Sequence, residues 1–347
     1  MIQMKLANFA RFDKINFYTQ GGHKLCFFLG GNAQFVIVGI IYFLGGTMQI
    51  DIIGVPIDLG ADRRGVDMGP SAIRYALLQQ GLEKLGYTVE DMGNVEVPIA
   101  EMCAVTDPNL KYIDCIMPMA RRVAGAVATS VQAGHLPVVL GGDHSLSLGS
   151  IRGAARHKKI GVLWVDAHAD FNTPETTPSG NIHGMPLAAL CGLGSSDLVQ
   201  LWDEPVPVID PKHVAIIGAR DLDEGEKRNL SQAGVMVMSM EQVDRLGMVA
   251  TMEKAFERIS QDVDGIYLSF DMDVMDPRHA PGVGTPVTGG LTYREAHLIC
   301  ELVAESGTLV GMDLVEVNSI LDVQNQTALL GVEFILSALG KRIWNGN

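Results

Sequence analysis

The pattern of apolar and polar positions changes at residue 48, after which short apolar runs alternate with longer amphipathic segments. Because the runs are rich in branched side chains and are bounded by polar residues or glycine, they predict β-strands. The predicted strands lie at residues 48–56, 88–93, 136–141, 160–166, 213–218, 235–239, 265–270 and 308–315. Most of these runs are apolar at successive positions, which is typical of parallel strands that are buried on both faces.

The segments between the strands predict helices, among them residues 71–85, 109–133, 240–259 and 293–305. Two helix starts are indicated locally, one by Asp107 before Pro108 and one by a capping box of Thr292 with Glu295. Strands that alternate with helices predict an α/β fold, with three layers (α/β/α) around a doubly wound, mainly parallel eight-stranded sheet. The composition does not change within residues 48–347, so we expect a single catalytic domain there.

Residues 1–47 have a different character, with a basic segment followed by an apolar run at 25–44. This order fits a signal sequence or membrane anchor. It also fits an extension that is not part of the native protein, with Met48 as the true start, because residues 44–47 could be encoded by a purine-rich ribosome-binding sequence. We favour a non-native or disordered extension, and a mass spectrum of the native protein that contained residues 1–47 would contradict it.

Charge and cysteine content limit the partners and the compartment. The formal net charge of −14 argues against a nucleic-acid surface or a stable association with anionic membranes. The five cysteines show no zinc-type spacing, so we expect reduced thiols and a cytoplasmic location.

Carboxylates and histidines follow three of the predicted strands. One strand ends in DAHAD (166–170), another in DMD (271–273), and a third in GGDH (141–144). A single cluster of this kind is often a solvated turn. Three clusters are harder to explain by folding alone, because unpaired charges at buried strand ends are costly. Parallel α/β sheets bind their ligands at the carboxyl ends of the strands, so we expect these side chains to meet there.

The candidate ligands are His144, Asp166, His168, Asp170, Asp271 and Asp273. Four carboxylates, two imidazoles and no sulfur favour a hard divalent cation such as Mn²⁺ over a structural zinc ion. Six side chains exceed what one catalytic ion needs, whereas two ions bridged by a carboxylate and a hydroxide would use them all. Such a pair activates water, so the donor set predicts hydrolysis.

The motifs GGDHS (141–145), DAHAD (166–170), SFDMD (269–273) and DPRHAPGVGTPVTGGLTYRE (276–295) resemble those of the ureohydrolase family, and within it the arginases. The resemblance extends from Ile52 to Leu339. It implies two Mn²⁺ ions per subunit, a homotrimer or homohexamer, and hydrolysis of L-arginine to L-ornithine and urea by a metal-bridging hydroxide. One ion would be held by His144, Asp166, Asp170 and Asp271, and the other by Asp166, His168, Asp271 and Asp273.

The loop between Phe171 and His183 decides the substrate, because an α-amino acid needs hydrogen-bond donors for its carboxylate. The loop offers four suitable side chains, Asn172, Thr177, Ser179 and Asn181. By resemblance, Asn172, Thr177 and Ser179 meet the α-carboxylate, while Asp223 and Glu226 receive the α-ammonium group. An ordinary capped helix start is the other interpretation of this acidic pair.

The resemblance also implies catalytic roles. Glu316 would pair with the guanidinium group, Asp170 would take the proton from the nucleophile, and His183 would relay protons to the leaving amine. Thr285 would lie near the guanidinium group, although a turn hydroxyl is an equally good interpretation.

Three alternatives remain open at this level. The first is a related ureohydrolase that acts on agmatine or another guanidino compound. The second is a bimetal phosphohydrolase, for which the motifs offer only Arg220, Arg278 and Arg294 as phosphate ligands. The third is a non-enzymatic descendant of the family.

Overall fold

The structure is a computed structural model, and it describes residues 15–18, 24–27, 48–202 and 205–344. The chain divides into two compact units, residues 1–46 and residues 47–347. In the first unit, strands β1 (Ile15–Tyr18) and β2 (Lys24–Phe27) pair antiparallel. The prediction of a non-native extension or an anchor otherwise falls on residues outside the described part.

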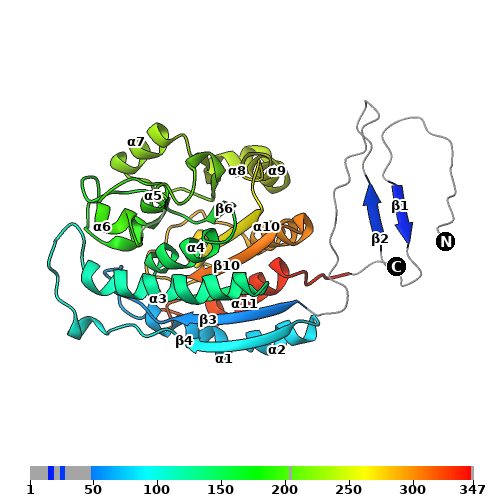
Figure 1. Cartoon of the computed structure of the whole chain (residues 1–347), viewed down its shortest axis with the longest axis horizontal. Coiled ribbons are helices and arrows are strands. Elements are labelled where there is room, and N and C mark those ends of the chain that lie inside the picture. The colour runs from blue at the N-terminus through cyan, green and yellow to red at the C-terminus, as the bar shows by residue number, and fades with distance from the viewer. Residues whose placement is uncertain (1–14, 19–23, 28–47, 203–204, 345–347) are drawn as a thin grey trace. The chain divides into compact units, whose positions relative to one another are not determined.

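The second unit is built on one sheet with helices packed around it (Figure 1). The strand order in this sheet is β4-β3-β5-β10-β9-β6-β7-β8. The strands are β3 (Gln49–Val55), β4 (Thr88–Asn94), β5 (Leu136–Gly141), β6 (Ile160–Val165), β7 (Val214–Ile217), β8 (Met236–Met238), β9 (Gly265–Asp271) and β10 (Leu309–Val315). All eight predicted strands are therefore confirmed, and every pairing in the sheet is parallel.

Helices cover both faces of this sheet. They are α1 (Gly69–Tyr75), α2 (Leu78–Lys84), α3 (Ile113–Gln132), α4 (Ser147–Ala155), α5 (Pro186–Leu190), α6 (Ser196–Val199), α7 (Glu224–Ala233), α8 (Met240–Leu246), α9 (Met248–Ile259), α10 (Tyr293–Ser306) and α11 (Gln326–Ala338). Two hydrophobic cores result, one on each face. On β6, Val162 and Trp164 point into one core, and Leu163 and Val165 point into the other.

The predicted helices need three corrections. The segment 71–85 is two helices, because Leu77 adopts a left-handed φ of 65° between α1 and α2. The segment 240–259 is likewise divided at Gly247, whose φ is 77°. Asp107 and Pro108 open a turn and not a helix, since Tyr112 has a φ of 58° and α3 begins at Ile113. The capping box of Thr292 and Glu295 is confirmed at the start of α10.

The prediction of reduced cysteines is wrong for one pair. Cys103 and Cys115 form a disulfide that joins the short helix Ala100–Met102 to the start of α3. Cys191 and Cys300 are free and buried. The cysteines therefore no longer support a cytoplasmic location.

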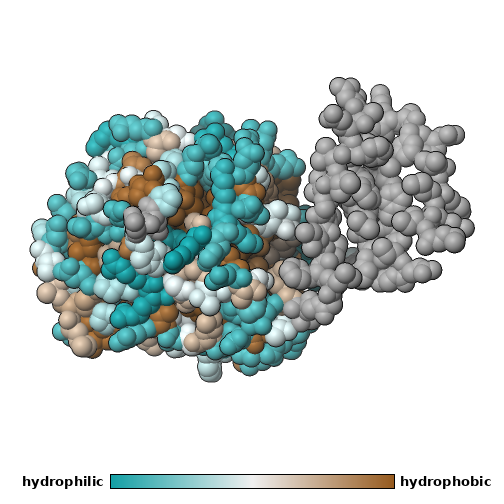
Figure 2. All heavy atoms as spheres, in the orientation of Figure 1, coloured by the Kyte–Doolittle hydropathy of each residue, from teal (hydrophilic) through white to brown (hydrophobic). Residues whose placement is uncertain are grey.

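Within the part of the chain that the structure describes, no helix has both the length and the apolar character needed to cross a bilayer. Figure 2 shows one face of the larger unit as a mosaic in which hydrophilic and hydrophobic residues alternate.

Candidate active site

Four adjacent central strands deliver the candidate chemistry at their carboxyl ends. In the order β5-β10-β9-β6 they are followed by His144, Glu316, Asp271 with Asp273, and the segment from Asp166 to Asp170. Parallel pairing thus brings together motifs that lie far apart along the chain, as the sequence predicted.

The backbone at two of these strand ends is unusual. Asp170 has a φ of 50° and Glu316 a φ of 63°, a left-handed conformation that L-residues with a β-carbon rarely adopt. The amide of Glu316 donates to the carbonyl of Gly142, which is itself held close to Val55 and Ile57. With this backbone, the Asp170 carboxylate reaches Nδ1 of His144 and the Glu316 carboxylate reaches Nδ1 of His183.

The first ligand group surrounds His144. Its Nδ1 atom lies 3.2 Å from Oδ2 of Asp166, 3.0 Å from Oδ2 of Asp170 and 3.1 Å from Oδ2 of Asp271. All four side chains are buried.

The second group surrounds His168, whose Nδ1 atom lies 3.0 Å from Oδ2 of Asp273 and 3.5 Å from Oδ1 of Asp166. Asp166 belongs to both groups and presents a different oxygen to each histidine. This arrangement matches the bridging role predicted for Asp166. Asp271, the second predicted bridge, falls in the group of His144, and its Oδ1 atom accepts from the amide of Asp273.

The electrostatics of these groups fit a divalent cation. Burial, together with the charges of Asp273 and Asp166, raises the pKa of Asp271 well above its usual range. Burial and the charge of Asp166 raise the pKa of Asp170 to about 6. Among the described residues, Nδ1 of His144 is buried and has no hydrogen-bond partner, although three carboxylate oxygens face it. Cations at this position would satisfy both the nitrogen lone pair and the crowded carboxylates.

Further buried residues orient the first ligand group. The indole ring of Trp164 stacks on His144 with ring centroids 4.0 Å apart, and its Nε1 atom donates to Asp166 Oδ2 at 2.9 Å. On the other side, Nε2 of His144 lies 2.8 Å from Oγ of Ser269, which donates to Asp313 at 2.6 Å. Such contacts fix the orientation of a metal-ligating imidazole.

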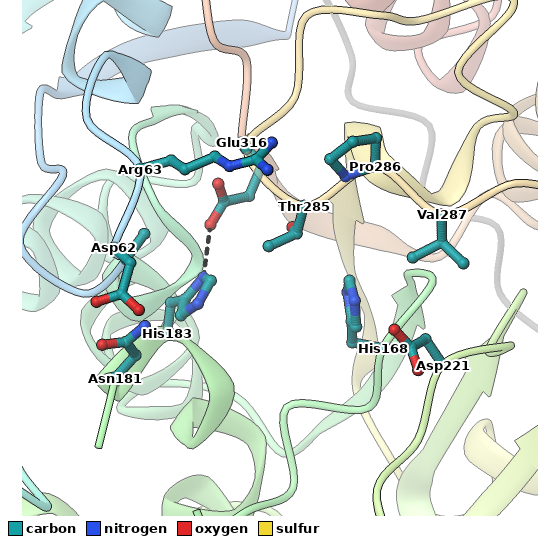
Figure 3. Close-up of a pocket in the computed structure, with 12 residues that line it drawn as sticks. Asp62, Arg63, His168, Asn181, His183, Asp221, Thr285, Pro286, Val287 and Glu316 are labelled. Atoms are coloured by element: carbon teal, nitrogen blue, oxygen red, sulfur yellow. Dashed lines mark hydrogen bonds and ion pairs between the residues drawn. The ribbon is translucent and has the colours of Figure 1, made fainter. Parts of the chain in front are cut away.

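A cavity of about 390 Å³ opens beside the second group (Figure 3). Its lining includes His168, His183, Thr285 and Glu316. Nδ1 of His183 lies 3.1 Å from Oε1 of Glu316, whereas Oε2 of Glu316 is buried and, among the described residues, has no partner. Thr285 donates to Oδ2 of Asp273 at 2.9 Å, so its hydroxyl supports a ligand carboxylate as well as lining the cavity.

A second cavity of about 270 Å³ shares His168, His183 and Thr285 with the first. Asn172 and Asp223 line it, and Nδ2 of Asn172 donates to Oδ2 of Asp223 at 2.9 Å.

For the acidic pair Asp223 and Glu226, the structure shows the capped helix start and also places both side chains at the second cavity. Asp223 does cap α7, because its Oδ1 accepts from the amides of Gly225 and Glu226, yet the same side chain lines the cavity. Glu226 lines it too and is buried, accepts from the amide of Phe171, and has its pKa raised by burial to about 8.

The other loop residues divide into two kinds. Asn181 lines the first cavity. In the described part of the chain, the hydroxyls of Thr177 and Ser179 instead accept backbone N–H groups of the loop itself, from Gly180 and Asn181 respectively, and neither residue lines the two cavities.

Sequence reasoning missed several residues at this site. Asp62, Arg63 and Asp221 line the first cavity, and Trp164, Ser269 and Asp313 support the ligands. Trp164 and Ser269 stand inside the quoted strands, and a polar group in an otherwise apolar buried strand was the available signal.

A parallel α/β/α fold with two imidazole and carboxylate groups at its central strand ends defines a metal-dependent hydrolase. The model of the arginase family matches residues 48–340, so the chain belongs to the arginase family. The arginase of Bacillus caldovelox is 48% identical over 290 residues, which cover 83% of this chain and 97% of that protein. Its native structure at pH 5.6 superposes with a TM-score of 0.83 and covers 86% of this chain and 100% of the other.

A more distant relative shows the same fold with a bound amino acid. The structure of Entamoeba histolytica arginase in complex with L-ornithine is 29% identical, has a TM-score of 0.78, and covers 85% of this chain and 99% of the other.

Proposed function

We propose that this chain hydrolyses the guanidinium group of L-arginine to give L-ornithine and urea. The observation that carries the proposal is the sharing of Asp166 between two histidine and carboxylate groups, the second of which presents His168 to a cavity that also contains Glu316 and His183. Membership of the arginase family and the relatives named arginase support it.

Two Mn²⁺ ions would occupy the two groups. His144, Asp166, Asp170 and Asp271 would hold one ion, and Asp166, His168, Asp271 and Asp273 the other. When bound, such a pair of ions supplies Lewis acidity, which lowers the pKa of a water molecule to near neutrality. The absence of sulfur and the excess of carboxylate oxygens favour Mn²⁺ over zinc.

Glu316 would orient the substrate. Its unpartnered Oε2 atom can accept a charge-assisted hydrogen bond from the guanidinium group, and Oε1 is already fixed by His183 and by the amide of His144. A planar cation held in this way presents its central carbon to the ligand groups, and positioning of this kind lowers the barrier to attack.

Two residues would move protons. The Oδ2 atom of Asp170 lies 3.0 Å from Nδ1 of His144 in the first ligand group, so this carboxylate is placed to take the proton released from the nucleophile. His183 lines both cavities and could relay a proton to the departing amine.

The amino-acid end of the substrate would occupy the second cavity and its rim. Asn172 lines the second cavity and Asn181 the first, and both would donate to the α-carboxylate. Thr177 and Ser179 line neither cavity and would contact the α-carboxylate through bridging water. Asp223 and Glu226 would accept from the α-ammonium group.

The phosphohydrolase alternative has no support in the site. Arg220 donates to backbone carbonyls, among them those of Asp273 and Val287, while Arg278 pairs with Asp276 and Arg294 with Glu301. None of the three lines either cavity in the described part of the chain, and Arg63 is the one arginine in the lining of the first cavity. A single guanidinium group is a weak site for phosphate, so the arginines on which this alternative depended do not support it.

The test is urea release by the full chain loaded with Mn²⁺, with L-arginine and agmatine compared at equal concentration. We expect a strong preference for L-arginine and a loss of about 100-fold or more in Glu316→Gln, which removes the charge that orients the substrate. A preference for agmatine would contradict the assigned substrate, and the absence of urea from both compounds would contradict the reaction.

A further inference from the structure

The segment before α3 packs against the substrate loop. The amide of Lys111 donates to the carbonyl of Gly180 at 3.0 Å. Gly180 has a φ of 76°, and a β-carbon at this residue would lie 1.9 Å from the carbonyl oxygen of Pro108. Only glycine fits there, so the two segments are fixed at backbone distance. The Cys103–Cys115 disulfide closes the segment that contains Pro108 and Lys111.

The side chain of Lys111 joins two residues of the first cavity. Its Nζ atom donates to Oδ1 of Asp62 at 3.0 Å and to Oδ1 of Asn181 at 2.9 Å. Asp62 and Asn181 lie next to each other on the side of the cavity that carries His183 (Figure 3). The Lys111 side chain is 28% exposed, so its ammonium group is partly shielded from solvent.

These two contacts have different consequences. Because the ammonium group occupies Oδ1 of Asn181, this amide can act on Asp62 and on a ligand only through the two N–H bonds of its NH₂ group. The hydrogen bonds from Lys111 and Asn181 keep the pKa of Asp62 below its usual range, so this carboxylate, whose side chain is 67% exposed, is negatively charged at the mouth of the cavity. Without Lys111, that charge would stand uncompensated beside Asn181.

We propose that Lys111 is a positioning residue that determines specificity for substrates with an α-carboxylate. It turns the amide of Asn181 so that it donates, and it neutralises Asp62, which would otherwise repel the carboxylate. This inference rests on the proposed function and names a residue that tunes the same site. Lys111 acts through Asn181 and Asp62 and not on the reacting atoms, so it affects binding of the amino-acid end and not the chemical step.

The test uses the full chain loaded with Mn²⁺ and measures kcat and KM for L-arginine. It also measures competitive inhibition by L-ornithine and by putrescine, which has the same carbon chain without the carboxylate. In Lys111→Met we expect KM for L-arginine and the inhibition constant of L-ornithine to rise together by about five- to tenfold. We expect kcat to change by less than about twofold, and inhibition by putrescine to be unchanged or stronger.

Three further variants isolate the charge. Lys111→Arg should restore KM to within about twofold of the unaltered chain, because a guanidinium group keeps the positive charge. Adding Asp62→Asn to Lys111→Met should recover part of the lost affinity, since it removes the uncompensated carboxylate. Lys254→Met removes an exposed lysine on α9 and should change nothing.

The outcomes separate this inference from the proposed function. No urea from the unaltered chain would contradict the reaction itself. Normal turnover with an equal loss of affinity for L-ornithine and putrescine, or a fall in kcat alone, would overturn the role of Lys111. If Lys111→Met fails to fold, Asp62→Asn alone provides the test. We expect the inhibition constant of L-ornithine to fall and that of putrescine to rise. An unchanged ratio of the two inhibition constants would overturn the inference.

Discussion

Nδ1 of His183 lies 3.1 Å from Oε1 of Glu316, and both side chains line the cavity beside the ligand groups. Burial acts to lower the pKa of His183, but the hydrogen bond to Glu316 prevails and raises it to about 9. The imidazole is therefore protonated at neutral pH, and it can donate a proton without first taking one from solvent.

We predict that Glu316→Gln lowers the pKa of His183 by about one unit or more, because the neutral amide no longer stabilises the imidazolium. An NMR titration of the ring nitrogens in metal-free protein measures this directly. His213, which directly precedes β7 and so lies at the amino ends of the strands, has its pKa lowered by burial and provides an internal control whose titration should not change. An unchanged curve for His183 would show that Glu316 does not set its charge.

The same pair predicts a pH dependence of stability. The folded pKa of His183, about 9, lies above the unfolded value of 6.5. Its contribution to the free energy of unfolding is therefore complete below pH 6.5 and is lost as the pH rises through 9. Urea denaturation of the unaltered chain and of His183→Gln should give a difference that shrinks over this interval. A difference that grows with pH would contradict the assignment.

Trp164 should control metal affinity. Trp164→Phe keeps the stacking on His144 but removes the hydrogen bond to Asp166. We expect Mn²⁺ affinity to fall by about 10- to 100-fold, as for other residues that orient metal ligands. Metal content after equilibration against buffered Mn²⁺ gives the measurement. Trp202→Phe, whose ring lies under the Arg156 guanidinium group, is the matched control and should bind metal normally.

Removal of the metal should reverse the effect of pH on thermal stability. In metal-free protein the raised pKa of Asp170, about 6, means that stability increases as the pH falls from 7 toward 5, because the folded form takes up the proton first. Protons compete with Mn²⁺ for the same oxygens, so the loaded protein should instead lose stability over this range. Melting temperatures at pH 5, 6 and 7 with and without chelator provide the comparison, and parallel curves would contradict it.

The disulfide should support the substrate loop. Replacing both Cys103 and Cys115 by serine removes a cross-link between two residues that are 12 positions apart in the sequence. We expect a loss of about 2 to 3 kcal/mol in the free energy of unfolding. KM for L-arginine should also rise, because the segment that carries Lys111 is less constrained. A dithiol reductant should reproduce both effects in the unaltered chain and have no effect on the double variant.

The inner strands of the sheet could be predicted from the sequence because they are buried on both faces, so each one appears as a nearly continuous apolar run. The edge strand β4 is exposed at most positions and has a more polar sequence, so its signal was weaker. The helix limits could not, since a single left-handed residue such as Leu77 or Tyr112 interrupts a helix without interrupting the apolar pattern. Cys103 and Cys115 were misjudged for a related reason: pairing depends on how a turn folds back, and the spacing alone does not show it.

The clustering of the candidate ligand side chains could be predicted because each lies at, or a few residues after, the carboxyl end of its strand. Their supports could not, because these depend on the order of strands in the sheet. Ser269 on β9 reaches both His144, which follows β5, and Asp313 on the intervening β10. Lys111 reaches Asn181 only because Gly180 permits close backbone contact.

The left-handed backbone of Asp170 and Glu316 means that each carboxylate is held at a position where glycine would be more stable. Each conformation costs about 1 to 3 kcal/mol for a residue with a β-carbon, and glycine would relieve that cost while removing the carboxylate. A descendant released from catalysis would therefore gain stability by drifting to glycine or asparagine at either position. Under the proposed function, the carboxylates of Asp170 and Glu316 are therefore kept at a cost in stability, and replacing either residue by glycine should raise the free energy of unfolding while it abolishes urea release.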